Sequence, residues 1–226
     1  MRYPAEWLQG TSLGEAVASE LRLQIINGTI KPGEVLSENR IAADFGTSRS
    51  PVREAMRTLS AEGLIRLERM GAAVIGLQPK DRDELYDVRY LIESFAQQRL
   101  ADNPTDTLIE RLNRVIDRME LAAKHEDIVE FAFQDLTFHE TIIREADHTR
   151  IFHLWNSIRH VVMTVMLITT EEVFSRGEDN ISRVINKHRK LINGLKSKDP
   201  ARIQREVEEY FADSRNTLRR SLPPSS

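Results

Sequence analysis

The sequence predicts a mainly α-helical protein, in which three helices and a β-hairpin precede an all-α bundle of about six helices. Two observations lead to this fold class: apolar residues recur at helical spacing through most of the chain, and strand signals occur only before residue 79. A chain of 226 residues with 40% apolar content is long enough for two modest domains. We expect a first domain over 1–78, a second over 79–222, and a disordered tail over 223–226.

The first predicted helix covers residues 12–27. Ser12 stands three residues before Glu15, which is the pattern of a capping box, and apolar residues then recur at every fourth position. A second, short helix is expected over residues 38–45, capped by Ser37. These spacings put the apolar side chains of each helix on one face, where a neighbouring helix can cover them.

A third helix and a hairpin complete the first domain. The helix is expected over residues 49–62, just before Gly63. Residues 64–77 read LIRLERMGAAVIGL, which is typical of two short strands, and Met70 with Gly71 predicts the tight turn between them. The order is therefore three helices followed by a hairpin.

From Pro79 onward, long helical patterns follow one another without strand signals. Helix breaks are expected at residues 103 and 104, near His125, around Asp147, across residues 175–180 and at Asp199. They leave about six helices in a compact bundle. The segment 152–168 is too apolar for a fully solvated helix, so it is either core or a dimer surface.

The overall charge is close to neutral, with 32 basic and 35 acidic side chains and a net of -3. This balance excludes the uniformly basic surface of a nonspecific nucleic-acid coat protein, but a local basic patch remains compatible with DNA binding. The absence of cysteine excludes disulfides, thiolate metal sites and cysteine nucleophiles. The longest apolar run is far shorter than a bilayer span and the first residues lack a secretion signal, so we expect a cytoplasmic protein with no membrane segment.

The predicted third helix carries a row of arginines along one edge. Its apolar residues share one arc, and the opposite arc carries Arg49, Ser50, Arg53 and Arg57. A short helix, a glycine turn and a second helix with arginines near its start form the arrangement that enters the DNA major groove. Arginine bonds guanine O6 and N7 and also clamps phosphate, and Ser48 adds a hydroxyl at the helix start. The alternative is an ordinary solvated helix whose arginines pair with Glu54 and Glu62.

Residues 36–76 also carry a recognisable family pattern. The stretch SRSPVREAMRTLSAEGLI resembles the hallmark of the winged helix in GntR-type bacterial transcription regulators. The long helical second half is similar to the effector-binding FCD domain of the FadR branch, so that the resemblance covers nearly the whole chain. It implies a homodimeric repressor or activator that binds a palindromic operator in double-stranded DNA and is controlled by a small metabolite.

The resemblance also implies which residues touch DNA. The positions where the family contacts DNA are Arg49, Ser50, Pro51 and Arg53. Gly71 falls at the tip of the wing, and the hairpin geometry would bring that tip, with Met70, to the neighbouring minor groove. One departure is Asn39, where the family usually has arginine; Arg40 beside it either compensates or points elsewhere.

A carboxylate and an imidazole share an apolar helical face in the second domain. Asp135 and His139 stand four residues apart among the apolar residues of the stretch FAFQDLTFHETII. Burying either group alone is costly, so from spacing alone they are a helix-surface pair, a satisfied core histidine, or part of a site.

The resemblance favours a site. DLTFHETI resembles the FCD motif in which an aspartate and a histidine bind a divalent metal, and a second family histidine aligns with His188. A third would fall at position 210, where this chain has Tyr210. Two histidines and one carboxylate suit zinc, nickel, manganese or iron. Tyr210 can instead donate a hydrogen bond to an effector or to a metal-bound water.

Arg89 lies on the first helix of the second domain, where the family commonly directs polar groups toward the effector pocket. An organic acid held by a metal and by Arg89 together is a physically coherent effector, and we expect one. The alternative is that Arg89 pairs with Asp87 or Glu93.

Two other classes of function compete with a regulator. A metal-dependent enzyme would use Asp135, His139 and His188, because two histidines and a carboxylate also occur in non-haem iron enzymes. That hypothesis leaves the first domain unexplained. A helical scaffold that binds only protein leaves the arginine row unexplained as well.

Overall fold

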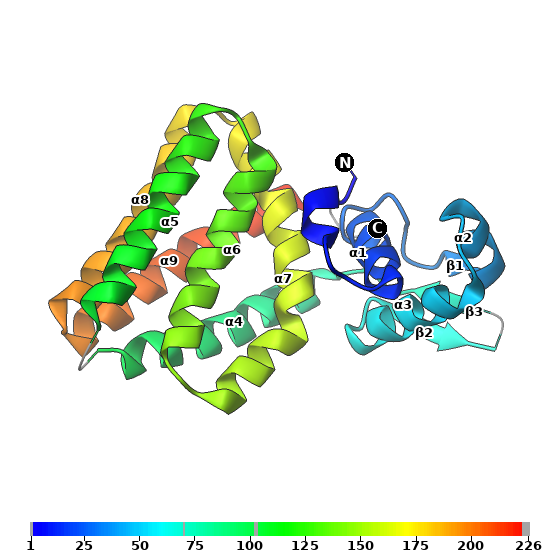
Figure 1. Ribbon diagram of the computed structural model, residues 1–226, viewed down its shortest axis with the longest axis horizontal. Helices are drawn as coiled ribbons and strands as arrows, with labels where there is room; N and C mark the ends of the chain where they lie inside the picture. Colours follow the sequence, from blue (N-terminus) through cyan, green and yellow to red (C-terminus); the bar gives the residue numbers. More distant parts are fainter. Residues whose placement is uncertain (1, 70, 102–103, 223–226) are drawn as a thin grey trace. The chain divides into compact units, whose positions relative to one another are not determined.

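The computed structural model describes residues 2–69, 71–101 and 104–222 (Figure 1). They form two compact units, one made of the chain up to Arg82 together with Leu222, and the other of Asp83–Ser221. Within the described residues, three α-helices and a small sheet precede six further α-helices, which confirms the predicted fold class. The expected turn residue Met70, the break at residue 103 and the tail 223–226 lie outside the described residues.

The first unit begins with a short 3-10 helix, and three α-helices follow: η1 (Ala5–Leu8), α1 (Leu13–Ile26), α2 (Glu38–Asp44) and α3 (Arg49–Ala61). Ser12 caps α1, because its Oγ accepts a hydrogen bond from the backbone N–H of Glu15 at 3.0 Å, as predicted. Ser37 stands at the N-cap of α2 but makes no side-chain capping bond, so that prediction is only half right.

Helices α1 and α3 pack through apolar side chains and one buried ion pair. Leu21 of α1 and Val52 and Leu59 of α3 are at most 3% exposed. Arg22 on α1 is fully buried and donates from Nε and Nη2 to the two carboxylate oxygens of Glu62, each at 2.7 Å. Since either charge alone would be costly to bury, this pair fixes α1 against the C-terminal end of α3.

A three-stranded antiparallel sheet completes the first unit, in the order β1-β3-β2. Its strands are β1 (Val35–Leu36), β2 (Ile65–Glu68) and β3 (Gly71–Val74). The predicted hairpin is the pair β2 and β3, which are hydrogen-bonded along their length. Strand β1 was not predicted because two residues are too short to show an alternating pattern.

Six α-helices follow the sheet: α4 (Pro79–Arg99), α5 (Asp106–Lys124), α6 (Ile128–Glu145), α7 (Thr149–Ser175), α8 (Glu178–Ser197) and α9 (Pro200–Ser221). Their ends carry the expected local signals. Asp199 accepts a hydrogen bond from the backbone N–H of Ala201 at 2.9 Å, and Pro200 occupies the first position of α9.

The long helix α7 accounts for the apolar segment 152–168. It is long and apolar enough to cross a membrane by length and composition alone, but half of its most apolar window is buried inside the protein. Residues 161–168 are all buried, and Trp155 is buried with its Nε1–H donating to Glu140 on α6 at 2.9 Å. Core packing therefore explains most of the apolar residues in this segment.

Four of these helices converge on one buried region. Helix α6 packs against α5 and α7, and α8 packs against α5 and α9 (Figure 1). Tyr86 and Tyr90 on α4 meet Phe211 on α9 edge-on, with ring centroids 6.3 and 5.6 Å apart. Polar side chains on the inner faces of α4, α6, α8 and α9 consequently lie close to one another.

Candidate functional site

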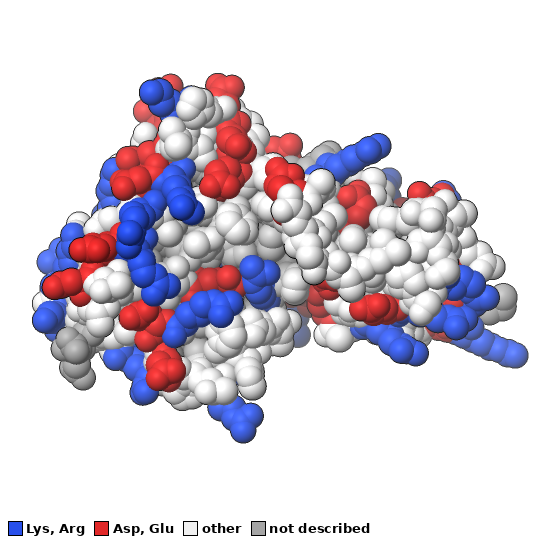
Figure 2. All heavy atoms as spheres, viewed as in Figure 1, with Lys and Arg blue, Asp and Glu red and all other residues white. Residues whose placement is uncertain are grey.

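The arginine row lies on the exposed side of α3, as its periodicity predicts. The opposite side is the buried face of the helix, formed by Val52, Ala55, Met56 and Leu59. The side chains of Arg49 and Arg53 are 54% and 52% exposed, and Arg57 is exposed as well. Figure 2 shows basic side chains gathering toward the hairpin end of the first unit, whereas both signs of charge are interspersed over the visible face of the helical unit.

One carboxylate faces two of these arginines. Oε2 of Glu38 on α2 lies 2.8 Å from Arg49 Nη2 and 2.9 Å from Arg53 Nε. The hydrogen bonds from Arg49 and then Arg53 lower the pKa of Glu38 below its usual value. The partners expected for an ordinary solvated helix were wrong, because Glu54 hydrogen-bonds to Ser12 and Glu62 pairs with Arg22.

The N-terminal end of α3 is exposed to solvent, and its first backbone N–H groups lack a side-chain cap. Ser48 occupies the N-cap position without a side-chain capping bond, and both Ser48 and Ser50 are exposed. Pro51 sits in the first turn, where a missing backbone N–H costs little because that turn has no intrahelical acceptor. Arg40 on α2 is 85% exposed and only loosely paired, 3.9 Å from Asp44. The hydroxyls, free N–H groups and guanidinium groups are therefore accessible to a polyanion.

Gly71 has a structural reason to be glycine. Its φ of 136° is unfavourable for other residues, and a Cβ added there would lie 2.3 Å from the carbonyl oxygen of Leu36. The close approach of β1 to β3 requires this position to lack a side chain. A role of Gly71 in touching DNA stays a prediction.

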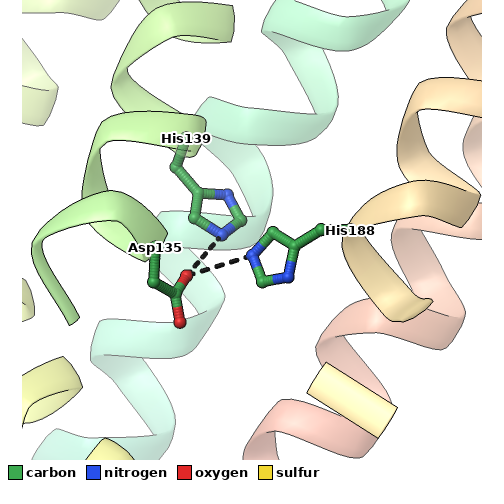
Figure 3. Close-up of side chains that lie close together, drawn as sticks. All are labelled: Asp135, His139 and His188. Carbon is green, nitrogen blue, oxygen red and sulfur yellow. Dashed lines mark hydrogen bonds and ion pairs between the residues drawn. The ribbon is translucent and has the colours of Figure 1, made fainter. Parts of the chain in front are cut away.

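The second unit brings the three predicted metal ligands together. Asp135 and His139 lie one turn apart on α6, and His188 reaches them from α8 (Figure 3). Asp135 Oδ1 is 3.3 Å from His139 Nε2 and 3.1 Å from His188 Nε2. All three side chains are buried, and their candidate ligand atoms lie within 4.8 Å of one another. A helix-surface pair is therefore not the role of Asp135 and His139.

In each imidazole, the partner of Nδ1 determines whether Nε2 carries a hydrogen or a free lone pair. Nδ1 of His188 lies 2.8 Å from the carbonyl oxygen of Val184, and Nδ1 of His139 lies 2.5 Å from Oε2 of Glu93. The Nδ1 of His188 is hydrogen-bonded to its carbonyl, whereas the Nδ1 of His139 makes a close ion-pair contact with Glu93 that lacks hydrogen-bond geometry. In each ring the nearest partner of Nδ1 is an acceptor, so we assign the hydrogen to Nδ1. In the neutral rings, the Nε2 lone pair of His188 then faces Asp135, and that of His139 faces both the Tyr210 hydroxyl and Asp135.

This donor set fits a divalent metal. Two imidazole lone pairs and a carboxylate oxygen repel one another unless a proton or a cation lies between them. Nitrogen and oxygen ligands at this separation suit zinc, nickel, manganese or iron. Asp135, His139 and His188 thus form a buried cluster, called here the histidine cluster, that has the composition to hold such an ion.

The charges of the histidine cluster stabilise one another. Burial alone disfavours ionised Asp135, but His188 and His139 outweigh it and hold the pKa of Asp135 below its usual range. Burial also opposes the charged forms of His139 and Glu93, yet their attraction prevails; the pKa of His139 is raised and that of Glu93 is lowered. Burial first, and then Asp135, raises the pKa of Tyr210 well above its usual value, so Tyr210 is a neutral hydroxyl.

Glu93 was missed as a member of this site. The sequence suggested it only as a partner of Arg89, and that alternative is confirmed: Arg89 Nε and Nη2 lie 3.0 and 2.9 Å from Glu93 Oε1. Asp87, the other suggested partner, pairs with Arg215 instead. The spacing of four residues between Arg89 and Glu93 was visible in the sequence, but the contact with His139 on another helix was not.

Tyr210 lies where the resemblance placed it, against the histidine cluster. Its hydroxyl is 2.7 Å from His139 Nε2, and its ring lies 5.3 Å from that of His188. It also borders a small cavity of about 30 Å³, which is room for one water. Much of the cavity wall consists of hydroxyl and cationic groups. They belong to Tyr86, Arg89, Thr169, Thr170, Lys187, Tyr210, Ser214 and Thr217.

Comparison with known proteins covers both units. The family described as "Bacterial regulatory proteins, gntR family" matches residues 13–75, and the FCD domain matches residues 84–213. The gluconate operon transcriptional repressor of Bacillus subtilis (strain 168) is 43% identical over 211 residues, which is 93% of this chain and 87% of that protein. The repressor of the same name from Bacillus licheniformis is 40% identical over the same shares.

Solved structures share the fold. E. coli McbR/YncC superimposes with a TM-score of 0.70 over 93% of this chain and 98% of that chain, at 21% sequence identity. The Listeria monocytogenes protein Lar gives a TM-score of 0.67 with the same coverage, at 20% identity.

Proposed function

The chain belongs to the GntR family of bacterial regulatory proteins and carries an FCD domain, and on this premise we propose that it is an effector-responsive transcriptional repressor. It is a DNA-binding regulator, so the competing hypothesis of a metal-dependent enzyme built on Asp135, His139 and His188 falls away. The observation that carries the proposal is the exposed arginine row on a helix whose other face is core. The regulator acts in the cytoplasm, where its operator lies.

The DNA-binding part of the proposal assigns α3 to the major groove. Arg49 and Arg53 read or clamp the operator, Arg57 and Arg40 neutralise phosphates, and the serines and Pro51 at the start of α3 let backbone N–H groups approach a phosphate. A homodimer places two such helices on a palindrome, with half-sites about 34 Å apart.

The cavity beside the histidine cluster is the effector site, and its ligand is a sugar acid. The relatives' name refers to the gluconate operon, and gluconate carries one carboxylate and several hydroxyls. Arg89, Lys187 and Tyr210 line the cavity and suit such a ligand. Because about 30 Å³ holds only a water, the lining side chains must move apart when a ligand enters.

The metal part of the proposal assigns a divalent ion to the histidine cluster. Asp135, His139 and His188 would hold it, and when bound it would supply an electrophilic centre for carboxylate or hydroxyl oxygens of the effector. Effector binding then favours one arrangement of the dimer, and a coupling of about 1–3 kcal/mol is enough to release the operator.

A gel-shift titration tests the repressor function. The parent protein should retard DNA taken from beside its own gene, and gluconate should weaken that complex while a neutral sugar of the same length should not. Retardation that is equally strong with unrelated DNA at matched salt would contradict operator recognition. Retardation that stays the same in the presence of every sugar acid would contradict the effector assignment but not the assignment of α3 to DNA.

Elemental analysis tests the metal. Protein purified without chelator should contain close to one divalent ion per chain, and His139→Ala should contain a small fraction of that amount. Equal metal content in the parent and the variant would show that the ion is bound elsewhere.

A further inference from the structure

Glu93 and Arg89 form a buried pair directly behind the histidine cluster. Both are about 1% exposed, and they lie one turn apart on α4. Each oxygen of Glu93 serves a different partner: Oε1 receives the Arg89 guanidinium, and Oε2 faces Nδ1 of His139. The carboxylate therefore bridges a fixed cation on its own helix to an imidazole on α6.

We propose that Glu93, held in place by Arg89, is the positioning residue that turns His139 into a metal ligand. This inference rests on the proposed metal site. It adds the two residues that decide which nitrogen of His139 is free to bind the ion. It also gives Arg89 a role that does not depend on the effector, which is to hold Glu93 in place.

The need for such a residue follows from the surroundings of His139. Its Nε2 lies 2.7 Å from the Tyr210 hydroxyl and 3.3 Å from Asp135 Oδ1, so a ring protonated at Nε2 could donate to either oxygen and close the site. The negative charge of Glu93, 2.5 Å from Nδ1, favours the hydrogen on Nδ1 instead, which leaves the Nε2 lone pair for a metal. His188 is oriented in the same way, but by the neutral carbonyl of Val184.

Arg89 is needed because Glu93 is buried. A carboxylate without a cation in this region would be strongly unfavourable, and it would be drawn away from His139 toward any available donor. The Arg89 guanidinium is itself confined, with its carbon 5.1 Å from the ring of Tyr86 and 5.4 Å from that of Phe211. The pair thus holds Oε2 at a fixed place in front of the imidazole.

The test compares two changes of carboxylate to amide on the same helix. Glu93→Gln should bind zinc roughly 10- to 100-fold more weakly than the parent in calorimetric titrations, which is the usual effect of losing such an outer partner. Asp87→Asn is the matched control, because Asp87 is 63% exposed and pairs at the surface with Arg215. The control should bind zinc as the parent does.

A second readout separates positioning from a general loss of structure. Nitrogen-15 NMR of the zinc-loaded parent should show His139 bound through Nε2 with a hydrogen on Nδ1, and Glu93→Gln should weaken or reverse that pattern. Wild-type zinc affinity together with an unchanged His139 pattern in Glu93→Gln would overturn the inference. A parent protein that takes up no zinc would instead contradict the proposed metal site.

A double variant covers the case in which Glu93→Gln does not fold. Arg89→Met combined with Glu93→Leu removes both buried charges together, so neither is left unpaired and the bundle should fold. The folded double variant should show the same loss of zinc affinity. Full affinity in that protein would overturn the inference.

Discussion

The arginine row on α3 and the histidine cluster differ in how their charges are held. Arg49 and Arg53 are half exposed and share one carboxylate on a neighbouring helix, so water can replace that partner at little cost. The histidine cluster is buried, and its ring nitrogens face Asp135, Glu93, Tyr210 and the carbonyl of Val184. The exposed arginines can therefore exchange Glu38 for a DNA phosphate. A buried group of the histidine cluster can lose its charged partner only when a proton or a metal ion takes the place of that partner.

The largest effect is expected from removing a charge in the histidine cluster. Asp135→Asn keeps the shape of the side chain but loses the carboxylate, so zinc affinity should fall by more than about 100-fold. In thermal melts, zinc at 100 times the Kd of the parent should stabilise the parent by about 2.7 kcal/mol and the variant by no more than about 0.4 kcal/mol. Asp117→Asn, on the exposed face of α5, is the control. An equal rise in melting temperature for Asp135→Asn and the parent would contradict the site.

A smaller effect is expected on the exposed side, from Arg53→Ala. Loss of one base-reading arginine should cost about 1–3 kcal/mol of operator binding and should relax the preference at one base pair. Arg118→Ala, an exposed arginine on α5, makes the same charge change away from α3 and should bind the operator as the parent does. Equal affinity of Arg53→Ala and the parent at matched salt would exclude α3 as the recognition helix.

The sequence was sufficient for the parts of this comparison that depend on one helix at a time. The arc of Val52, Ala55 and Leu59 on α3 follows from a period of 3.6 residues, and so does the shared face of Asp135 and His139. The contacts of Glu38 with Arg49 and of Glu93 with His139 join different helices, so no local spacing reveals them. Family resemblance supplied His188 because it carries information across helices.

Tyr210→His adds a third imidazole to the histidine cluster, at the position where the family has a histidine. An added nitrogen ligand should raise zinc affinity on the order of tenfold, because position 210 faces the histidine cluster from α9. Tyr210→Phe is the control, since it keeps the ring and removes only the hydroxyl. Calorimetric titration measures both variants. If His and Phe at this position raise the affinity equally, relief of the Tyr210 hydrogen bond to His139, and not a new ligand, is the cause.

The smallest effect is expected from Glu38→Gln, which removes the carboxylate shared by Arg49 and Arg53. Because Glu38 is at the surface, the melting temperature should stay close to that of the parent. Operator and nonspecific DNA should both bind a few fold more tightly, since the arginines no longer exchange a carboxylate for a phosphate. The gain should be larger for nonspecific DNA, because Glu38 also orients the two guanidinium groups toward the operator. Gel shifts at two salt concentrations, with Asp117→Asn as the control for net charge, measure both gains; weaker operator binding by Glu38→Gln would instead make Glu38 a direct contact of the DNA.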